Sequence, residues 1–288
     1  MPIRTVAKKI IPARAIPSLR KWQNYLFSLS LQESLKEQDL QDIYEKLSII
    51  VPELLNQYTT LKIDTPFLEL KVRALHSFQV SLVGKAIEKL SIFDNSTPTI
   101  VDIGDSAGTH IQYLQSLYEN FRSLSVNCDK RAVDKIKQKG MEAIHARAEE
   151  LEQYNISPDI FLAFEILEHL FNPIGFLHNI SINTACKGFV ITVPYRSSSR
   201  VSLGHIRYNT QNKVFAENTH IFEFSPDDWK LIFKHAGWEI KYEEIFLQYP
   251  RKHWLRITKK IWKETDFEGF YGAILTRDST WSSQYSDW

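Results

Sequence analysis

The sequence predicts an α/β fold, in which a mostly parallel seven-stranded sheet carries helices on both faces and follows a helical N-terminal extension. From Thr99 onward, short apolar runs alternate with segments of helical period, the pattern of a parallel sheet wrapped by helices. Before Thr99, apolar residues recur at three- and four-residue spacing, which is typical of amphipathic helices.

The first third of the chain is predicted to be helical. One apolar stripe consists of Leu40, Ile43, Tyr44, Leu47, Val51, Leu54 and Leu55. A second helix should begin at Thr65-Pro66, because threonine caps helices and proline suits the first helical position, and should reach about Leu90. The turn-rich segment 94–98 follows. We therefore predict a helical extension over residues 1–95 and a second domain over residues 96–288.

The second domain should contain seven strands, each short, apolar and bounded by turn residues. The predicted strands are Thr99–Ile103, Leu124–Asn127, Glu142–His145, Ile160–Phe164, Phe189–Val193, Trp238–Phe246 and Phe270–Thr276. The last two should form a hairpin. Helices are expected at about 109–119, 131–139, 173–183 and from Ser225-Pro226 to Gly237.

Two segments do not fit this alternation. Residues 194–219 follow the fifth strand and have no clean period. Long loops in compact domains are usually lids or binding loops, and this one would face the cleft at the carboxyl ends of the strands. Residues 247–266 are predicted to be a basic loop between the two closing strands.

The net charge of +1 hides an uneven distribution of charge. The first 32 residues hold six Lys and Arg residues and no acid, and residues 246–263 hold another six, again with no acid. This composition suits peripheral contact with an anionic membrane, but two solvated basic faces would have the same composition. No apolar run approaches the roughly 20 residues needed to span a bilayer. Two distant cysteines show no disulfide or zinc pattern, so we expect a cytoplasmic protein.

The segment Asp102-Ile-Gly104-Asp-Ser106-Ala-Gly108 is the first candidate binding site. It follows a predicted strand and precedes a predicted helix, the context in which a glycine-rich turn becomes informative. Glycine lets the backbone approach a ligand without a Cβ in the way. The spacing is not the Gly-x-Gly-x-x-Gly of nicotinamide enzymes, and an acid just before the first glycine suits an amino group better than a pyrophosphate. We therefore do not favour NAD.

With the segments that follow it, this turn resembles the class I methyltransferases that use S-adenosylmethionine, over about Thr99 to Trp238. The resemblance implies a Rossmann-like fold in which Asp102, Gly104, Ser106 and Gly108 surround the methionine moiety and adenosine. It also implies that the segment around Ala148 contacts adenine, mainly through its backbone. Phe164, at the end of the fourth strand, completes the set of predicted cofactor residues.

Such enzymes commonly use an acid at the end of the second strand to bind the ribose hydroxyls, and this chain reads Asn127-Cys-Asp129 there. Either Asn127 binds the ribose while Asp129 caps the next helix, or Asp129 reaches the ribose itself. We favour Asn127, because Asp129 sits well for capping a helix that starts near Lys130. An amide can also accept from one hydroxyl and donate to the other.

A second constellation follows the fourth strand. Glu165, Glu168 and His169 are spaced so that they would share one face of a helical turn, and His220 comes after the predicted lid. The set resembles two metal-assisted groups of methyltransferases, the ubiquinone-pathway O-methyltransferases and the enzymes that methylate the 3′-terminal 2′-hydroxyl of small RNAs. Carboxylates and imidazoles suit one divalent cation, Mg²⁺ or Mn²⁺, bound by Glu165, Glu168, His169 and His220. Without metal, His169 or His220 would act as a general base.

These observations predict an S-adenosylmethionine-dependent methyltransferase that acts on oxygen, with Glu165, His169 and His220 as catalytic residues. The expected acceptor is a hydroxyl of a small molecule or a glycan, such as one of the cell envelope. One alternative is a nucleic-acid methyltransferase that uses the basic, aromatic-rich segments, although no RNA-binding module is recognisable. The other is an inactive scaffold that keeps the cofactor pocket.

Overall fold

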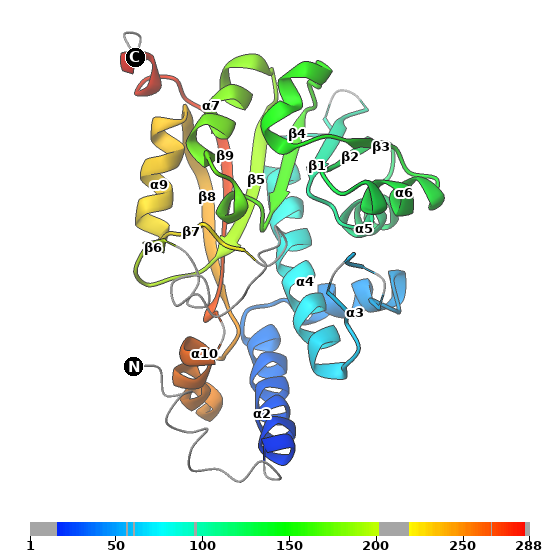
Figure 1. Ribbon diagram of the computed structural model, residues 1–288, viewed down its shortest axis with the longest axis vertical. Helices are drawn as coiled ribbons and strands as arrows, with labels where there is room; N and C mark the ends of the chain where they lie inside the picture. The colour runs from blue at the N-terminus through cyan, green and yellow to red at the C-terminus, as the bar shows by residue number, and fades with distance from the viewer. Residues whose placement is uncertain are drawn as a thin grey trace.

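A central sheet with helices on both faces forms the body of the protein, and α2 and α10 lie side by side at one end of it (Figure 1). The structure is a computed structural model that describes residues 16–55, 57–59, 61–94, 97–201, 219–265 and 267–285.

The seven-stranded sheet has the order β3-β2-β1-β4-β5-β9-β8. Neighbouring strands from β3 to β5 pair in parallel, whereas β9 runs antiparallel to both β5 and β8. This confirms the predicted fold class. All residues of β4 and β5 are buried, as expected for central strands covered on both faces. The strands are β1 (Thr99–Ile103), β2 (Arg122–Asn127), β3 (Ala143–His145), β4 (Ile160–Phe164), β5 (Gly188–Pro194), β8 (Trp238–Leu247) and β9 (Gly269–Arg277).

Three of the predicted helices begin with a side-chain cap, of which the cap at Thr65 was predicted. Thr65, Asn172 and Ser225 each accept a hydrogen bond from a backbone N–H of the first turn, and a proline follows each of them. The α-helices are α2 (Ile16–Glu37), α3 (Gln41–Ile50), α4 (Pro66–Lys89), α5 (Thr109–Leu117), α6 (Lys130–Gln138), α7 (Pro173–Asn183), α9 (Pro226–His235) and α10 (Lys259–Thr265). Shorter elements are η2 (Ala148–Tyr154), η3 (Leu167–His169), η5 (Trp254–Thr258), η6 (Ser282–Tyr285), β6 (Arg200–Val201) and β7 (Phe222–Glu223).

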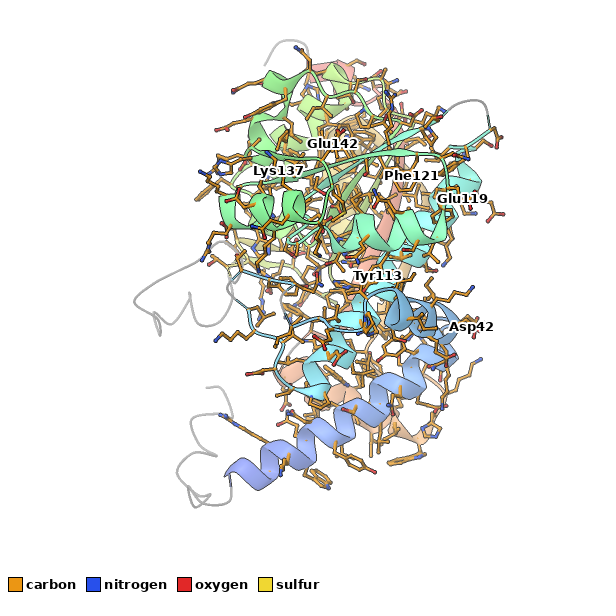
Figure 2. The ribbon with its side chains drawn as sticks, turned by 90° about the vertical axis from the view of Figure 1, so that its right-hand side faces the viewer. Asp42, Tyr113, Glu119, Phe121, Lys137 and Glu142 are labelled. Carbon is orange, nitrogen blue, oxygen red and sulfur yellow. The ribbon has the colours of Figure 1, made fainter. Side chains whose placement is uncertain are left out.

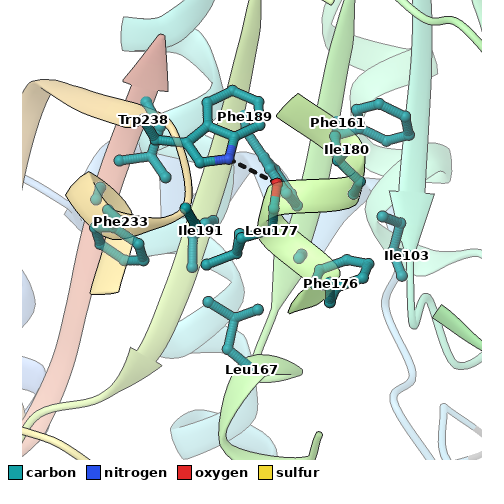
Figure 3. Packing of buried hydrophobic residues seen from close by; sticks show 14 of the residues in the cluster. Ile103, Phe161, Leu167, Phe176, Leu177, Ile180, Phe189, Ile191, Phe233 and Trp238 are labelled. Carbon is teal, nitrogen blue, oxygen red and sulfur yellow. Dashed lines mark hydrogen bonds between the residues drawn. The ribbon is translucent and has the colours of Figure 1, made fainter. Parts of the chain in front are cut away.

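One face of the sheet is covered by α7 and α9. Phe176 and Leu177 of α7 and Phe233 of α9 pack against Phe189 and other side chains of β5 (Figure 3). The indole of Trp238 belongs to the same layer, and its Nε1 donates to the carbonyl of Leu177 at 2.9 Å.

The other face is covered by α4, α5 and α6. The helix α4 lies close to β9, since a Cβ on Gly272 would meet Leu82 at 2.7 Å and Phe78 at 2.8 Å. Tyr113 extends from α5 toward α3 and α4, where its ring contacts His76 (Figure 2). The first third is therefore helical, as predicted, and α4 forms part of the layer over the sheet. The boundary at residue 95 stays a prediction.

The segment 247–266 is not the loop that we predicted. It contains η5 and α10, and Leu255 and Trp262 are buried. Trp262 is buried against α2, which is distant in the sequence: the rings of Phe27 and Trp262 stack with centroids 3.9 Å apart. Of the predicted lid over 194–219, residues 202–218 lie outside the described part, and its first described residues include β6, which pairs with β7. No helix within the described residues is long and apolar enough to cross a membrane.

Candidate active site

The glycine-rich turn joins β1 to α5 at the carboxyl edge of the parallel strands. Gly104 and Gly108 have φ angles of +93° and +74°, in the left-handed region that favours glycine. Gly104 N donates to the carbonyl of Val126 at 2.7 Å, which ties the turn to β2. Ser106 is partly exposed between the two glycines.

Asp105 holds this turn in shape, although sequence reasoning assigned it no role. Its buried carboxylate accepts from the backbone N–H of Thr109 at 3.0 Å and from the hydroxyl of Ser125 at 3.3 Å. The carbonyl of Asp105 accepts from the amide of Asn127 at 3.3 Å. A pattern search could have found only the contact with Thr109, four residues along the chain, because the contact with Ser125 depends on how β2 packs.

A chain of hydrogen bonds through His110 and Gln79 connects Asp102 to Thr192 on β5. His110 Nδ1 lies 3.1 Å from one carboxylate oxygen of Asp102, and His110 Nε2 lies 3.0 Å from Gln79 Oε1. Gln79 in turn donates to Thr192 Oγ1 at 3.1 Å. The other carboxylate oxygen of Asp102 is buried and has no hydrogen-bond partner among the described atoms.

The ionisation of Asp102 and His110 is linked. Burial, followed by the nearby charge of Asp105, raises the pKa of Asp102 to about 6. Burial opposes protonation of His110, but the charge and hydrogen bond of Asp102 outweigh it and raise the pKa of His110. Each partner therefore stabilises the charged form of the other.

At the end of β2, the two candidates for ribose binding have different surroundings. Asp129 caps α6, as predicted, by accepting from Arg131 N at 2.9 Å. The side-chain hydrogen bond from Arg131 is the main reason why the pKa of Asp129 falls to about 2. Asn127 Oδ1 accepts from Asp129 N at 2.7 Å, and its amide donates to the neighbouring turn. The assignment of the ribose to Asn127 stays a prediction.

Three further residues frame this region. Ala148 begins η2, and Phe164 ends β4 with its ring 5.0 Å from that of His110. Ile166, which sequence reasoning did not single out, lies over the glycine turn: a Cβ on Gly104 would be 2.1 Å from Ile166 Cδ1. A surface hollow of about 510 Å³ between α7 and α9 contains none of the predicted cofactor residues.

Glu168 is the most unusual side chain after β4. It is 0% exposed, and neither of its carboxyl oxygens has a hydrogen-bond partner among the described atoms. Burial, reinforced by the charge of Glu165, raises its pKa well above the usual value. Burying a carboxyl without a hydrogen-bond donor costs free energy, unless a cation or a donor compensates it.

Two imidazoles face Glu168. His169 Nδ1 lies 2.8 Å from the carbonyl of Thr219, which can only accept, so Nδ1 carries the proton and Nε2 the lone pair. That Nε2 is 3.9 Å from Glu168 Oε1. His220 Nδ1 lies 3.1 Å from Glu223 Oε1, and the rings of His169 and His220 meet edge to face at 4.8 Å. One candidate ligand atom from each of Glu168, His169 and His220 lies within 4.8 Å of the other two.

Glu165 is placed differently from our expectation of a shared helical face. The turn is a short 3-10 helix that starts at Leu167, and Glu165 precedes it with φ +55°. Glu165 therefore does not belong to the three-residue group, although its side chain neighbours Glu168. Burial raises the pKa of Glu165 to about 8. Its left-handed backbone cannot be read from residue spacing.

Glu223 is a second residue that the sequence analysis missed. It is buried, pairs with Arg200, and lies 4.0 Å from Arg196 Nε. Burial alone would raise the pKa of Glu223, but hydrogen bonds from His220 and Arg200 outweigh it and lower the pKa. An ionised Glu223 accepts from His220 Nδ1 and so leaves the lone pair of that ring on Nε2.

Comparison with known proteins decides the family. Residues 75–243 match the sequence profile of a methyltransferase domain, which is more than half of the 288-residue chain. The chain belongs to this methyltransferase family. The family match and the strand order of the sheet make it a class I methyltransferase, the superfamily that uses S-adenosylmethionine as methyl donor. No curated protein matches the methyltransferase by sequence.

Solved structures share its fold at low sequence identity. A candidate sarcosine dimethylglycine methyltransferase from Galdieria sulphuraria is 10% identical with a TM-score of 0.54, and the match covers 84% of this methyltransferase and 99% of that chain. The [4+2]-cyclase SpnF is also 10% identical, with a TM-score of 0.53 over 86% of this chain and 98% of its own. Since a cyclase shares the fold, the acceptor chemistry has to be argued from the site.

The glycine turn of the methyltransferase fits its cofactor. The unpartnered oxygen of Asp102 is suited to an ammonium group, because a buried carboxylate gains most from a charged donor. Gly104 and Gly108 have no Cβ of their own, and the places that a Cβ would take lie 2.1 Å from Ile166 Cδ1 and 2.2 Å from Met141 Cε. The side chain of Ile166 lies against Gly104 and would have to turn aside for a ligand to reach that backbone.

Proposed function

We propose that the protein transfers a methyl group to a hydroxyl oxygen of a small molecule or a glycan, and that one divalent cation assists it. The observation that carries the proposal is Glu168, a fully buried carboxyl without hydrogen-bond partners among the described atoms, which is grouped with two imidazoles. Such a side chain is costly to bury unless a cation or a donor compensates it.

The hydrogen bonds of the two imidazoles support a metal site. Imidazoles that bind metals commonly donate their other N–H to a carbonyl or a carboxylate, which fixes the ring and its tautomer. His169 donates in this way to Thr219 O, and His220 to Glu223. Both rings therefore offer Nε2 to the same space as Glu168. Glu165 neighbours this set and completes the proposed ligands.

Each side chain then has a defined task. Glu168, His169 and His220 would hold the cation, with Glu165 as the additional carboxylate. Mg²⁺ and Mn²⁺ fit a site with carboxylate ligands. A bound cation supplies Lewis-acid activation of an acceptor hydroxyl, and S-adenosylmethionine supplies an activated methyl group. Glu223, together with Arg200, would position His220.

The proposal is tested by metal binding and by turnover, measured separately. The affinity of the purified protein for Mn²⁺ is determined by titration calorimetry. We expect Glu168→Gln and His220→Ala to abolish binding, and Glu223→Ala to weaken it about 10- to 100-fold, as for other outer-shell partners of metal-binding histidines. His178→Ala is the matched control, because His178 is a partly buried histidine on α7, outside the set.

Turnover is followed as label transfer from methyl-labelled cofactor to phenols, cell-envelope glycans and nucleic acids. Treatment with EDTA should stop transfer and Mg²⁺ or Mn²⁺ should restore it, while His220→Ala should still bind S-adenosylhomocysteine. Full activity in EDTA would instead leave His169 as a metal-free general base. Label found only on nucleic acid, or on no oxygen at all, would overturn the assignment of the acceptor.

A further inference from the structure

Two segments more than 200 residues apart in the sequence form one end of the molecule, seen at the bottom of Figure 1. They are α2 and the stretch containing η5 and α10. The ring of Phe27 stacks on that of Trp262, and Ser30 Oγ lies 2.8 Å from Thr258 Oγ1. Trp262 and Ser30 are fully buried. These contacts make the two segments a single surface, which we name the basic tip.

The basic tip exposes large apolar side chains. Trp22 of α2 is 60% exposed, and Trp254 and Ile257 of η5 are 61% and 72% exposed. Leu19 and Tyr25 of α2 are also exposed. A group of exposed aromatic and aliphatic side chains usually marks a surface that binds a protein, a ligand or a membrane.

The same tip is strongly basic. Between residues 16 and 32 and between 246 and 263 the sequence contains Lys and Arg but no acidic residue. The nearby Glu37 is occupied, because its carboxylate accepts from the backbone N–H groups of Arg251 and Lys252 at 2.6 and 2.9 Å. Against one exposed acid among its described residues, Glu264 of α10, the tip exposes the basic residues Arg20, Lys21, Lys36, Arg251, Lys252, Arg256, Lys259, Lys260 and Lys263.

We propose that the basic tip docks the protein on an anionic membrane surface. Tryptophan and aliphatic side chains enter the boundary between headgroups and acyl chains, while Lys and Arg attract anionic lipids. Nucleic acid would also attract the positive charge. However, single-stranded binding surfaces stack bases on aromatic rings, and this accounts for neither Leu19 nor Ile257.

The tip adjoins the candidate active site. The ring of His220 stacks on Phe267, with centroids 5.2 Å apart. The next residue, Glu268, accepts from Tyr249 at 2.9 Å and lies within 4 Å of Lys259 and Lys263. These contacts connect the tip to His220, so a membrane held by the tip would lie on the side of the molecule that His220 occupies.

The test is co-sedimentation of the full chain with vesicles, which does not depend on methyl transfer. We expect binding to phosphatidylcholine vesicles that contain about one third phosphatidylglycerol, and little binding to pure phosphatidylcholine. Binding should weaken with salt. Each basic side chain near such a surface is worth roughly a factor of five, so Arg256→Ala with Lys260→Ala should cost about 30-fold. Trp254→Ser with Ile257→Ser should remove the binding that persists at high salt.

Lys137→Ala with Ile182→Ser is the matched control, since both residues are exposed on helices away from the tip, α6 and α7. This variant should bind vesicles like the wild type. The proposal is overturned if the wild type fails to sediment with anionic vesicles, or if the control loses as much binding as the tip variants. It is also overturned if the tip variants lose binding to single-stranded RNA while vesicles bind none of the proteins.

Discussion

At the scale of single residues, His110 lowers the pKa of Asp102, the carboxylate that we propose holds the ammonium group of the cofactor. The pKa of Asp102 is raised to about 6 by burial and by Asp105, and His110 acts in the opposite direction. A carboxylate that must be ionised to hold an ammonium group then loses affinity as the pH falls through 6. His110→Asn removes the charge that lowers the pKa of Asp102. The pH at which S-adenosylhomocysteine binding is lost should therefore rise.

Titration calorimetry between pH 5 and pH 8 measures this shift. Each unit of rise corresponds to about tenfold weaker binding at a pH below both midpoints. His178→Asn is the control, and its binding profile should follow the wild type. An unchanged midpoint in His110→Asn would show that His110 only fills space next to Asp102.

Residues such as Asp105, His110 and Glu223 could not be assigned from the sequence. Each has a partner on another element: Asp105 contacts Ser125 on β2, His110 contacts Gln79 on α4, and Glu223 contacts Arg200 on β6. The capping role of Asp129 was predictable, because its partner is two residues away. A side chain can be assigned from sequence when its contact is local.

At the scale of elements, Arg73 of α4 closes the end of α3. The side chain is 2% exposed, and its guanidinium donates to the carbonyls of Leu47, Val51 and Pro52 at 2.7 to 3.1 Å and to Glu69 at 2.7 Å. Leu47 O also accepts from Val51 N at 3.0 Å, and the carbonyls of Val51 and Pro52 follow the helix, so Arg73 ties the end of α3 and the residues after it to α4.

We expect Arg73→Leu to lower the free energy of unfolding by about 3 kcal/mol, because the carbonyls of Leu47, Val51 and Pro52 lose a charged donor. Urea denaturation followed by circular dichroism measures the loss. Glu69→Gln should cost less than about 1 kcal/mol, since the Glu69 side chain is 43% exposed. Equal losses in the two variants would mean that the ion pair, and not the end of α3, accounts for the stability.

Elements with a strong period were predicted almost to the residue. The bounds of β1, β4 and α7 agree with the sequence analysis, because apolar runs and a proline cap specify them locally. The turn after β4 and the helix α10 were not predicted. Glu165 has a left-handed backbone conformation, and nothing in the residue types after β4 indicates it. The helix α10 depends on the packing of Trp262 against α2, more than 200 residues away.

At the scale of the whole molecule, the helical extension completes the core of the methyltransferase. Phe78 and Leu82 of α4 lie against β9, and Leu31 and Leu35 of α2 pack with Phe246 and other side chains at the end of the β8–β9 hairpin. The matched family region also begins inside α4, at residue 75. The sheet is therefore covered on one face by the segment that we predicted as an extension.

A fragment of residues 97–288 should consequently fail to fold by itself. Each fully buried large apolar side chain contributes about 1.5–3 kcal/mol, so losing the partners of only five approaches the whole stability of a domain, about 5–15 kcal/mol. We expect the fragment to show no cooperative thermal transition by circular dichroism and to bind a hydrophobic dye. Co-expression with residues 16–94 should restore the transition, because it supplies the missing layer. A fragment that melted cooperatively near the wild-type temperature would show that residues 97–288 are an independent domain, which does not need the helices of residues 16–94 to fold.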